Sequence, residues 1–170
     1  LNGRKGKGTL RHVLDDTMTP MGGRLLEDML RHPWRELGPI TRVQDAVAFF
    51  HADDARRAAL REALKNVYDL ERLSTRISLN QGAPRDFIAL RNSLAALPDV
   101  YAALQGAGDA SAAAPDTAFG APGAADNMPK SVADVVKSWD NMQDCAALLQ
   151  SALVDSPPAV ITEGGLFKTG

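Results

Sequence analysis

The chain has 170 residues, a formal net charge of −2, 45% hydrophobic residues and 24% charged residues. This size and composition are typical of one globular domain, which buries roughly 70% of its unfolded surface and needs no disulfide or structural metal to hold a core. The near-neutral charge argues against a protein that binds nucleic acid mainly by neutralising phosphates. The single cysteine, Cys145, excludes an internal disulfide and a cysteine-rich zinc cluster.

No apolar run in the sequence approaches the roughly 18 residues that are needed to span a bilayer, and no signal peptide is recognisable. We therefore expect a soluble, cytoplasmic protein with no membrane partner. Because the chain begins at Leu1 rather than at a methionine, we also expect it to be a piece of a longer polypeptide.

Helical periodicity begins close to the N-terminus. Residues 9–16 place apolar side chains at i, i+3 and i+4, with Thr9 as the N-cap. Thr19 followed by Pro20 predicts a second start, because proline lacks only an N–H that would be unpaired at the first helical position. This second helix should end before Pro33.

Five further helices are predicted before the composition changes. They begin near Gly38, at Asp53 or Asp54, near Asp69, at Pro84, and shortly after Pro98, the last one running through Tyr101 and Leu104. Each has apolar residues at helical spacing, which predicts one face turned toward a shared core. The helix from Asp69 should end at the turn over residues 80–84, which contains Gly82.

Residues 106–129 have a different composition from the rest of the chain. Of these 24 residues, 17 are alanine, glycine, proline or serine. Such a segment buries too little apolar surface to offset the entropy lost on ordering. We therefore expect a disordered or flexible insertion here.

The last part of the chain predicts one long helix and a short hairpin. Ser131 and Asp134 resemble a capping box that opens a helix running to Leu153. The prolines at 157 and 158 exclude helix beyond it, and residues 160–166 are typical of a hairpin. The predicted fold class is all-α: an irregular core of six to eight helices, one long flexible loop and a short C-terminal hairpin.

No catalytic, cofactor-binding or metal-ligating constellation is apparent in the sequence. The glycine-rich start lacks the lysine of a phosphate-binding loop, because Gly8 is followed directly by Thr9. The histidines His12, His32 and His51 share no zinc-site spacing, and no G-x-S-x-G sequence marks a nucleophile. We expect no enzyme activity and no cofactor in this chain.

The densest charged group in apolar surroundings consists of Asp69, Glu71, Arg72, Arg76 and Arg85. One interpretation is a solvated helix face. The other is a structural lock between consecutive helices, in which Arg72 reaches carboxylates across the turn. The lock predicts that Arg72→Ala lowers the denaturation midpoint clearly.

Several short motifs follow one another along the chain. They are G-T-L at 8–10, V-L-D at 13–15, T-P-M-G at 19–22, V-Y-D-L-E-R-L-S-T-R at 67–76, P-R-D at 84–86, A-L-V-D-S-P-P at 152–158 and E-G-G at 163–165. In order and spacing they resemble the start of the core, or lever, domain of the MutS family of DNA mismatch repair proteins. The resemblance covers nearly the whole chain except residues 106–129, which look like an insertion longer than usual.

The resemblance implies that residues 1–170 are the first part of a discontinuous, single core domain with a structural role. In the family this domain lies between the DNA clamp and the ATPase of a dimeric mismatch sensor. The parent would bind mismatched double-stranded DNA through its other domains, form a homodimer, act with repair proteins such as MutL, and use ATP and Mg²⁺.

A freestanding helical interaction or regulatory module remains the alternative. An incomplete core should expose an apolar face and self-associate, whereas a complete module should be monodisperse.

Overall fold

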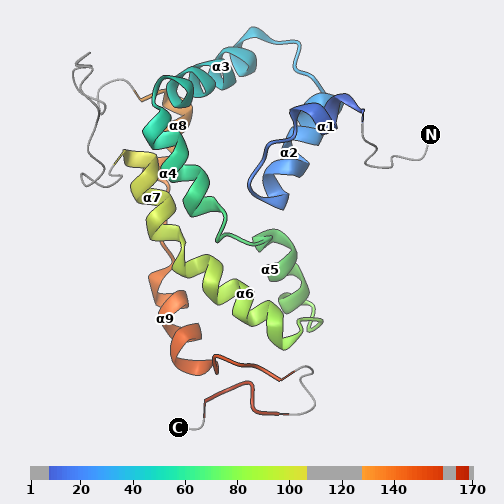
Figure 1. The fold of residues 1–170 in the computed structure, drawn as a ribbon, viewed down its shortest axis with the longest axis vertical. Coiled ribbons are helices and arrows are strands. Elements are labelled where there is room, and N and C mark those ends of the chain that lie inside the picture. The colour runs from blue at the N-terminus through green and yellow to red at the C-terminus, as the bar shows by residue number, and fades with distance from the viewer. Residues whose placement is uncertain (1–7, 107–127, 159–163, 169–170) are drawn as a thin grey trace.

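The structure is a computed structural model that describes residues 8–106, 128–158 and 164–168. Within these residues nine α-helices follow one another (Figure 1). Their bounds are α1 (Leu10–Leu14), α2 (Pro20–Arg31), α3 (Leu37–Ala52), α4 (Asp54–Leu64), α5 (Leu70–Ser78), α6 (Pro84–Ala95), α7 (Leu97–Gln105), α8 (Lys130–Lys137) and α9 (Gln143–Ala152). The described residues contain no strand longer than an isolated antiparallel bridge between Leu153 and Phe167, and the all-α class is confirmed.

The predicted helix starts are confirmed where a side chain supplies the missing acceptor. Thr19 Oγ1 accepts a hydrogen bond from the N–H of Gly22 at 3.1 Å, and Pro20 occupies the first helical position. Asp53 and Asp69 each accept from the backbone N–H three residues further on, at 2.9 Å and 3.3 Å. These contacts satisfy donors that have no partner inside the helix.

The helices form an elongated column with a separate pair at its side (Figure 1). Within the column α4 packs on α7, α5 on α6, α6 on α9, and α3 on both α4 and α8. The pair α1 and α2 lies beside the column, and α1 is the helix that packs most closely on α2 in the part of the chain described. No helix in the described ranges is both long and apolar enough to cross a membrane.

The main apolar core lies where α4, α7 and α8 meet. Its buried members are Val67, Ala96, Val100 and Leu104. Partly buried side chains surround them, among them Met21, Phe50, Leu60, Leu64, Val136 and Trp139. The apolar positions predicted for the middle of the chain therefore do converge on one cluster.

The predicted long helix over residues 131–153 is wrong in one respect, because it is broken into α8 and α9. Met142 has a left-handed backbone, with φ of 49°. Asp140 Oδ1 accepts from the N–H of Met142 at 2.8 Å, and Ser138 Oγ donates to the carbonyl of Asp134 at 2.9 Å. These short polar side chains offer the backbone partners that compete with the helix, and the apolar period continues across the break.

The predicted capping box at Ser131 is also absent. The helix begins one residue earlier, at Lys130, with Pro129 in the N-cap position and no side-chain cap. Ser131 Oγ instead donates to the carbonyl of Arg42 in α3, at 3.3 Å. The serine thus joins two helices instead of capping its own.

Two segments that were predicted to be non-helical, residues 106–129 and 160–166, follow α7 and α9 in the sequence. Gly106 ends α7 with φ of +80°, and a Cβ at this position would lie 3.0 Å from Arg56 Cζ. Residues 107–127, most of the predicted insertion, lie outside the described residues. The predicted hairpin falls partly on residues 159–163, which are also outside them, while Val154 N–H donates to the carbonyl of Leu166 at 3.0 Å.

Candidate functional site

Arg24 of α2 forms a charged junction between two helices. Its Nη1 lies 2.5 Å from Asp69 Oδ2 and its Nη2 lies 2.8 Å from Asp69 Oδ1, so the guanidinium grips one carboxylate with both nitrogens. Arg24 also donates to Glu71. Because Asp69 is the N-cap of α5 and Glu71 lies in its first turn, this junction ties α2 to the start of α5.

The junction holds its carboxylate in the ionised form. The hydrogen bonds from Arg24 lower the pKa of Asp69 below its ordinary value of 3.8, and the backbone N–H of Arg72 adds to this effect against the opposing effect of burial. The same hydrogen bonds raise the pKa of Arg24. Both partners therefore stay charged across neutral pH.

Arg76 forms a second junction, between α5 and α6. Its two terminal nitrogens lie 3.1 Å and 2.9 Å from Asp86 Oδ1 and Oδ2. Asp86 Oδ2 also accepts from the backbone N–H of Ala83 at 2.7 Å, where α6 begins. The carboxylate thus caps its own helix and holds the end of the preceding one.

The other predicted site residues do not join helices. Arg72 lies 3.5 Å from Asp69, at the start of its own helix, and 74% of its side chain is exposed. Arg85 forms no ion pair within the described ranges. Both arginines line a cleft of about 980 Å³ together with Asp69, Arg76 and Asp86. Arg24 links α2 to α5 and Arg76 links the consecutive helices α5 and α6, whereas Arg72 pairs only at the start of its own helix.

Several linking pairs were absent from the sequence-based prediction. One is Arg24 with its carboxylates, and another is Arg91 of α6 with Asp155, whose Nη1 and Oδ1 atoms lie 3.1 Å apart. A third joins Arg61 of α4 to Asp16, with Nη2 2.9 Å from the carboxylate and Nη1 3.0 Å from the carbonyl. A signal for Arg24 exists, because it follows Met21 by three residues and therefore shares the inward face of its helix. No local pattern indicates that Arg61 reaches a residue 45 positions earlier.

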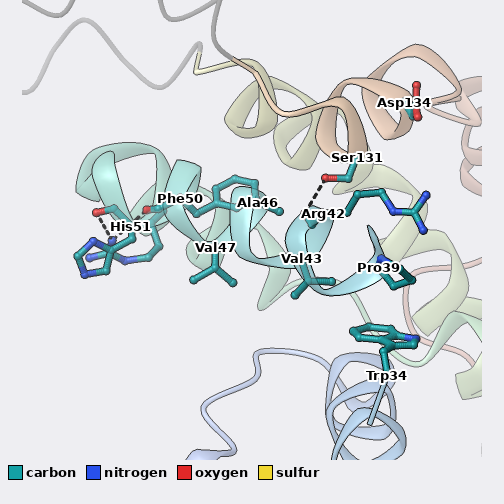
Figure 2. A pocket seen from close by; sticks show the side chains of 11 residues that line it. Trp34, Pro39, Arg42, Val43, Ala46, Val47, Phe50, His51, Ser131 and Asp134 are labelled. Atoms are coloured by element: carbon teal, nitrogen blue, oxygen red, sulfur yellow. Dashed lines mark hydrogen bonds between the residues drawn. The ribbon is translucent and has the colours of Figure 1, made fainter. Parts of the chain in front are cut away.

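A groove of about 790 Å³ runs along α3 (Figure 2). Its apolar lining comes from Pro39, Val43, Ala46, Val47 and Phe50, which repeat at helical spacing over three turns of α3. Figure 2 shows Val43 and Val47 projecting from α3 on the side where Trp34 lies. Such a stripe normally packs against another helix.

Polar groups mark the edges of the groove. Ser131 and Asp134 of α8 line one side, and Arg42 of α3 lies beside them (Figure 2). Val47 is 61% exposed and Trp34 is 43% exposed, so large apolar side chains face solvent here. The groove has no convergent set of catalytic groups, and its chemistry is that of a packing surface.

The residues that could carry covalent or metal chemistry are dispersed. Cys145 is half-buried in α9, and the negative charge of Asp144 together with partial burial raises the pKa of its thiol, which disfavours the reactive thiolate. Within the described residues no group of three or more His, Cys, Asp or Glu side chains is placed to hold a metal ion. Fold and site together define a helical domain whose charged residues join one helix to another.

Comparison with known proteins extends this description. A family model described as MutS domain III matches residues 1–169. DNA mismatch repair protein MutS of Desulfovibrio desulfuricans is 66% identical over 181 residues, and that of Nitratidesulfovibrio vulgaris strain DP4 is 54% identical over 170 residues. The MutS of Alkaliphilus oremlandii is 31% identical over 170 residues.

Each of these alignments covers the whole of this chain and 17% to 19% of the relative. The chain belongs to the MutS domain III family. It spans about a fifth of the length of the curated relatives that it matches.

Proposed function

We propose that residues 1–170 form the first part of a discontinuous core domain, which in a longer MutS polypeptide couples DNA binding to ATP hydrolysis. The observation that carries this proposal is the α3 groove, whose apolar stripe is only half-buried over three helical turns and leaves Val47 61% exposed. A second part of the same domain would bury this stripe. Stiff helices joined by ion pairs, as at Arg24 and Arg76, suit a part that transmits movement between other domains.

The activities of such a parent are also part of the proposal. It would bind mismatched double-stranded DNA through its other domains, act as a homodimer in the cytoplasm, and work with repair proteins such as MutL. It would be a DNA-dependent ATPase that uses ATP and Mg²⁺. The role of the present chain is structural, and the nucleotide site belongs to another domain of the parent.

The test compares the 170-residue chain with the whole parent by hydroxyl-radical footprinting. Trp34 should be oxidised several-fold more slowly in the parent, because the second part of the domain covers the groove. Trp139 is the internal reference, since it already stacks on Tyr101 with 5.9 Å between ring centroids. Equal oxidation of Trp34 in both proteins, together with a monodisperse isolated chain, would favour the freestanding interaction module.

The coupling itself is tested by Val47→Glu in the parent. A charge in the groove should weaken the packing of the second part and reduce the stimulation of ATP hydrolysis by mismatched DNA, while hydrolysis without DNA persists. Leu79→Glu is the matched control, because Leu79 is also 61% exposed but lies outside the groove. A parent with undiminished stimulation after Val47→Glu would contradict the coupling role.

A further inference from the structure

Residues 8–32, which we call the N-terminal arm, form a unit with its own internal bonds. Arg11 of α1 pairs with Glu27 of α2 and lies 3.6 Å from Asp15. Thr17 Oγ1 donates to Asp15 Oδ1 at 2.6 Å in the turn between the helices. Gly23 lies under this turn, where a Cβ would approach Thr17 Oγ1 to 3.3 Å. The arm therefore keeps its shape through contacts within itself.

The arm is fastened to the rest of the molecule mainly by charge. Arg24 of the arm grips Asp69 and Glu71 of α5, and Arg61 of α4 holds both the carboxylate and the carbonyl of Asp16. We call these two arginine-centred contacts the latch. Each side of the interface contributes one cation to it.

Apolar packing between the arm and the rest is sparse. In the main core cluster of the described residues, Met21 is the arm's one contribution. Gly23 is the one buried residue among residues 8–32. Of its other large apolar side chains, Val13 is 75% and Leu25 is 56% exposed, while Met18, Leu26 and Met29 are half-buried. No large apolar side chain of the arm is fully buried, so the hydrophobic effect holds the arm less strongly than it holds the core.

Four of the five side chains in the latch are accessible to solvent and its ions. Those of Arg24 and Arg61 are 34% and 39% exposed and those of Glu71 and Asp16 are 71% and 88% exposed, whereas that of Asp69 is 15% exposed. Contacts between exposed charges weaken as the Debye length falls from about 10 Å at 0.1 M salt to about 3 Å at 1 M. The polar contacts inside the arm connect α1, α2 and the turn between them. The helices themselves are also held by backbone hydrogen bonds.

We propose that the N-terminal arm moves as a rigid unit, closed against α4 and α5 when the latch is formed and released from them when the latch is broken. The contacts that distinguish the two states are the pairs of Arg24 and Arg61. Opening leaves α1 and α2 folded. This inference stands on the contacts of residues 8–32 alone and is independent of the proposed coupling role.

The experiment measures a distance between the arm and the body in the 170-residue chain. Spin labels are placed on Val13→Cys in α1 and Leu79→Cys after α5, both exposed, in a Cys145→Ala background. Pulsed dipolar spectroscopy at low salt should give one short, narrow distance distribution. High salt, and separately Arg24→Met at low salt, should each raise a longer-distance population several-fold, while the helical circular dichroism stays unchanged.

The matched control is Arg31→Met. Arg31 is on the same helix as Arg24 and carries the same charge, but it pairs with Glu27 inside the arm, at 2.6 Å. The distance distribution of this variant should equal that of the spin-labelled 170-residue chain with Arg31 unchanged. A label pair within the body, Val47→Cys with Leu79→Cys, should not respond to salt. An unchanged arm distance after Arg24→Met and at high salt would overturn the proposal, as would loss of helical signal in step with the longer distance.

Discussion

Ser93 in α6 is completely buried, yet its hydroxyl has both a donor role and an acceptor role filled. Its Oγ donates to the carbonyl of Ala89 at 2.7 Å and accepts from the N–H of Tyr68 at 2.9 Å. The second bond ties the connection between α4 and α5 to α6. The Ser93 hydroxyl is therefore the hydrogen-bond acceptor for the backbone N–H of Tyr68, a residue that lies outside any helix.

Ser93→Ala should destabilise the fold by about 1 to 3 kcal/mol, because it leaves the N–H of Tyr68 without an acceptor. Urea denaturation followed by circular dichroism measures the change. Ser74→Ala is the control, since Ser74 Oγ donates to the carbonyl of Glu71 on an exposed face, and its effect should stay within about 0.5 kcal/mol. Equal losses in the two variants would show that the bond to Tyr68 contributes little.

The lowered pKa of Asp69 makes the stability of the fold depend on pH. The folded state binds the proton more weakly than the unfolded state, so the stabilisation is fully present above the ordinary carboxyl pKa of 3.8. It is lost as the pH falls below 3.8 and through the lowered pKa of the folded state. The free energy of unfolding, measured from neutral to acid pH, should therefore fall less steeply in the Asp69→Asn variant than in the unsubstituted 170-residue chain. Identical slopes would mean that Arg24 does not perturb this carboxyl.

Cys145 should react slowly for an accessible thiol. Asp144 raises its pKa, so the thiolate fraction at neutral pH is smaller than in a free cysteine. Asp144→Asn should speed alkylation of Cys145 at pH 7, while denatured samples of both proteins should react alike. A slower reaction in Asp144→Asn would contradict this account.

At the scale of the helix, start signals are local, and most were predicted correctly, although the capping box at Ser131 was wrong. The side chains of Thr19, Asp53 and Asp69 each cap a helix by accepting from an N–H three residues further on. Donor and acceptor are therefore both visible in a short stretch of sequence. The break between α8 and α9 was missed because the apolar period runs through it. The polar cluster at residues 138–141 is typical of a turn and was the available signal.

Periodicity also predicts a helix without saying whether its apolar face is covered. The stripes of α1 and α3 repeat correctly, yet Val13 and Val47 are exposed. The candidate site shows the same limit, because Asp69 and Arg76 could be identified as junction residues from local charge, whereas Arg24 and Arg61 reach their partners across 45 positions. Long-range pairing depends on how helices are placed in space, which one sequence does not encode locally.

Gly106→Ala should destabilise α7 by at least about 1 kcal/mol, because alanine adopts the left-handed backbone at this cost. A second cost arises because the new Cβ would overlap Arg56 Nη2. Gly106→Asn separates the two effects, since asparagine tolerates positive φ but still has a Cβ. The midpoint of thermal denaturation should be highest with glycine at position 106, lower with asparagine and lowest with alanine. A Gly106→Asn variant as stable as the unsubstituted 170-residue chain would show that a Cβ at this position does not clash with Arg56.

At the scale of the whole molecule, the formal net charge of −2 disfavours binding to nucleic acid through phosphate contacts. The isolated chain should therefore bind a duplex containing a mismatch no better than a perfectly paired duplex. A fluorescence anisotropy titration with both duplexes at physiological salt measures the ratio of the two dissociation constants, which should be close to one. A severalfold preference for the mismatched duplex would place a DNA-reading surface in this chain.

The contact between Ser131 and Arg42 joins positions 89 apart in the chain. During synthesis at about 5 to 20 residues per second, α8 leaves the ribosome roughly 4 to 18 s after the part of α3 that it covers. Closing so long a loop also costs more entropy than forming any contact within α3. The apolar stripe of α3 is thus without this neighbour for several seconds in the life of every newly made chain, a period in which it can meet other unfinished chains.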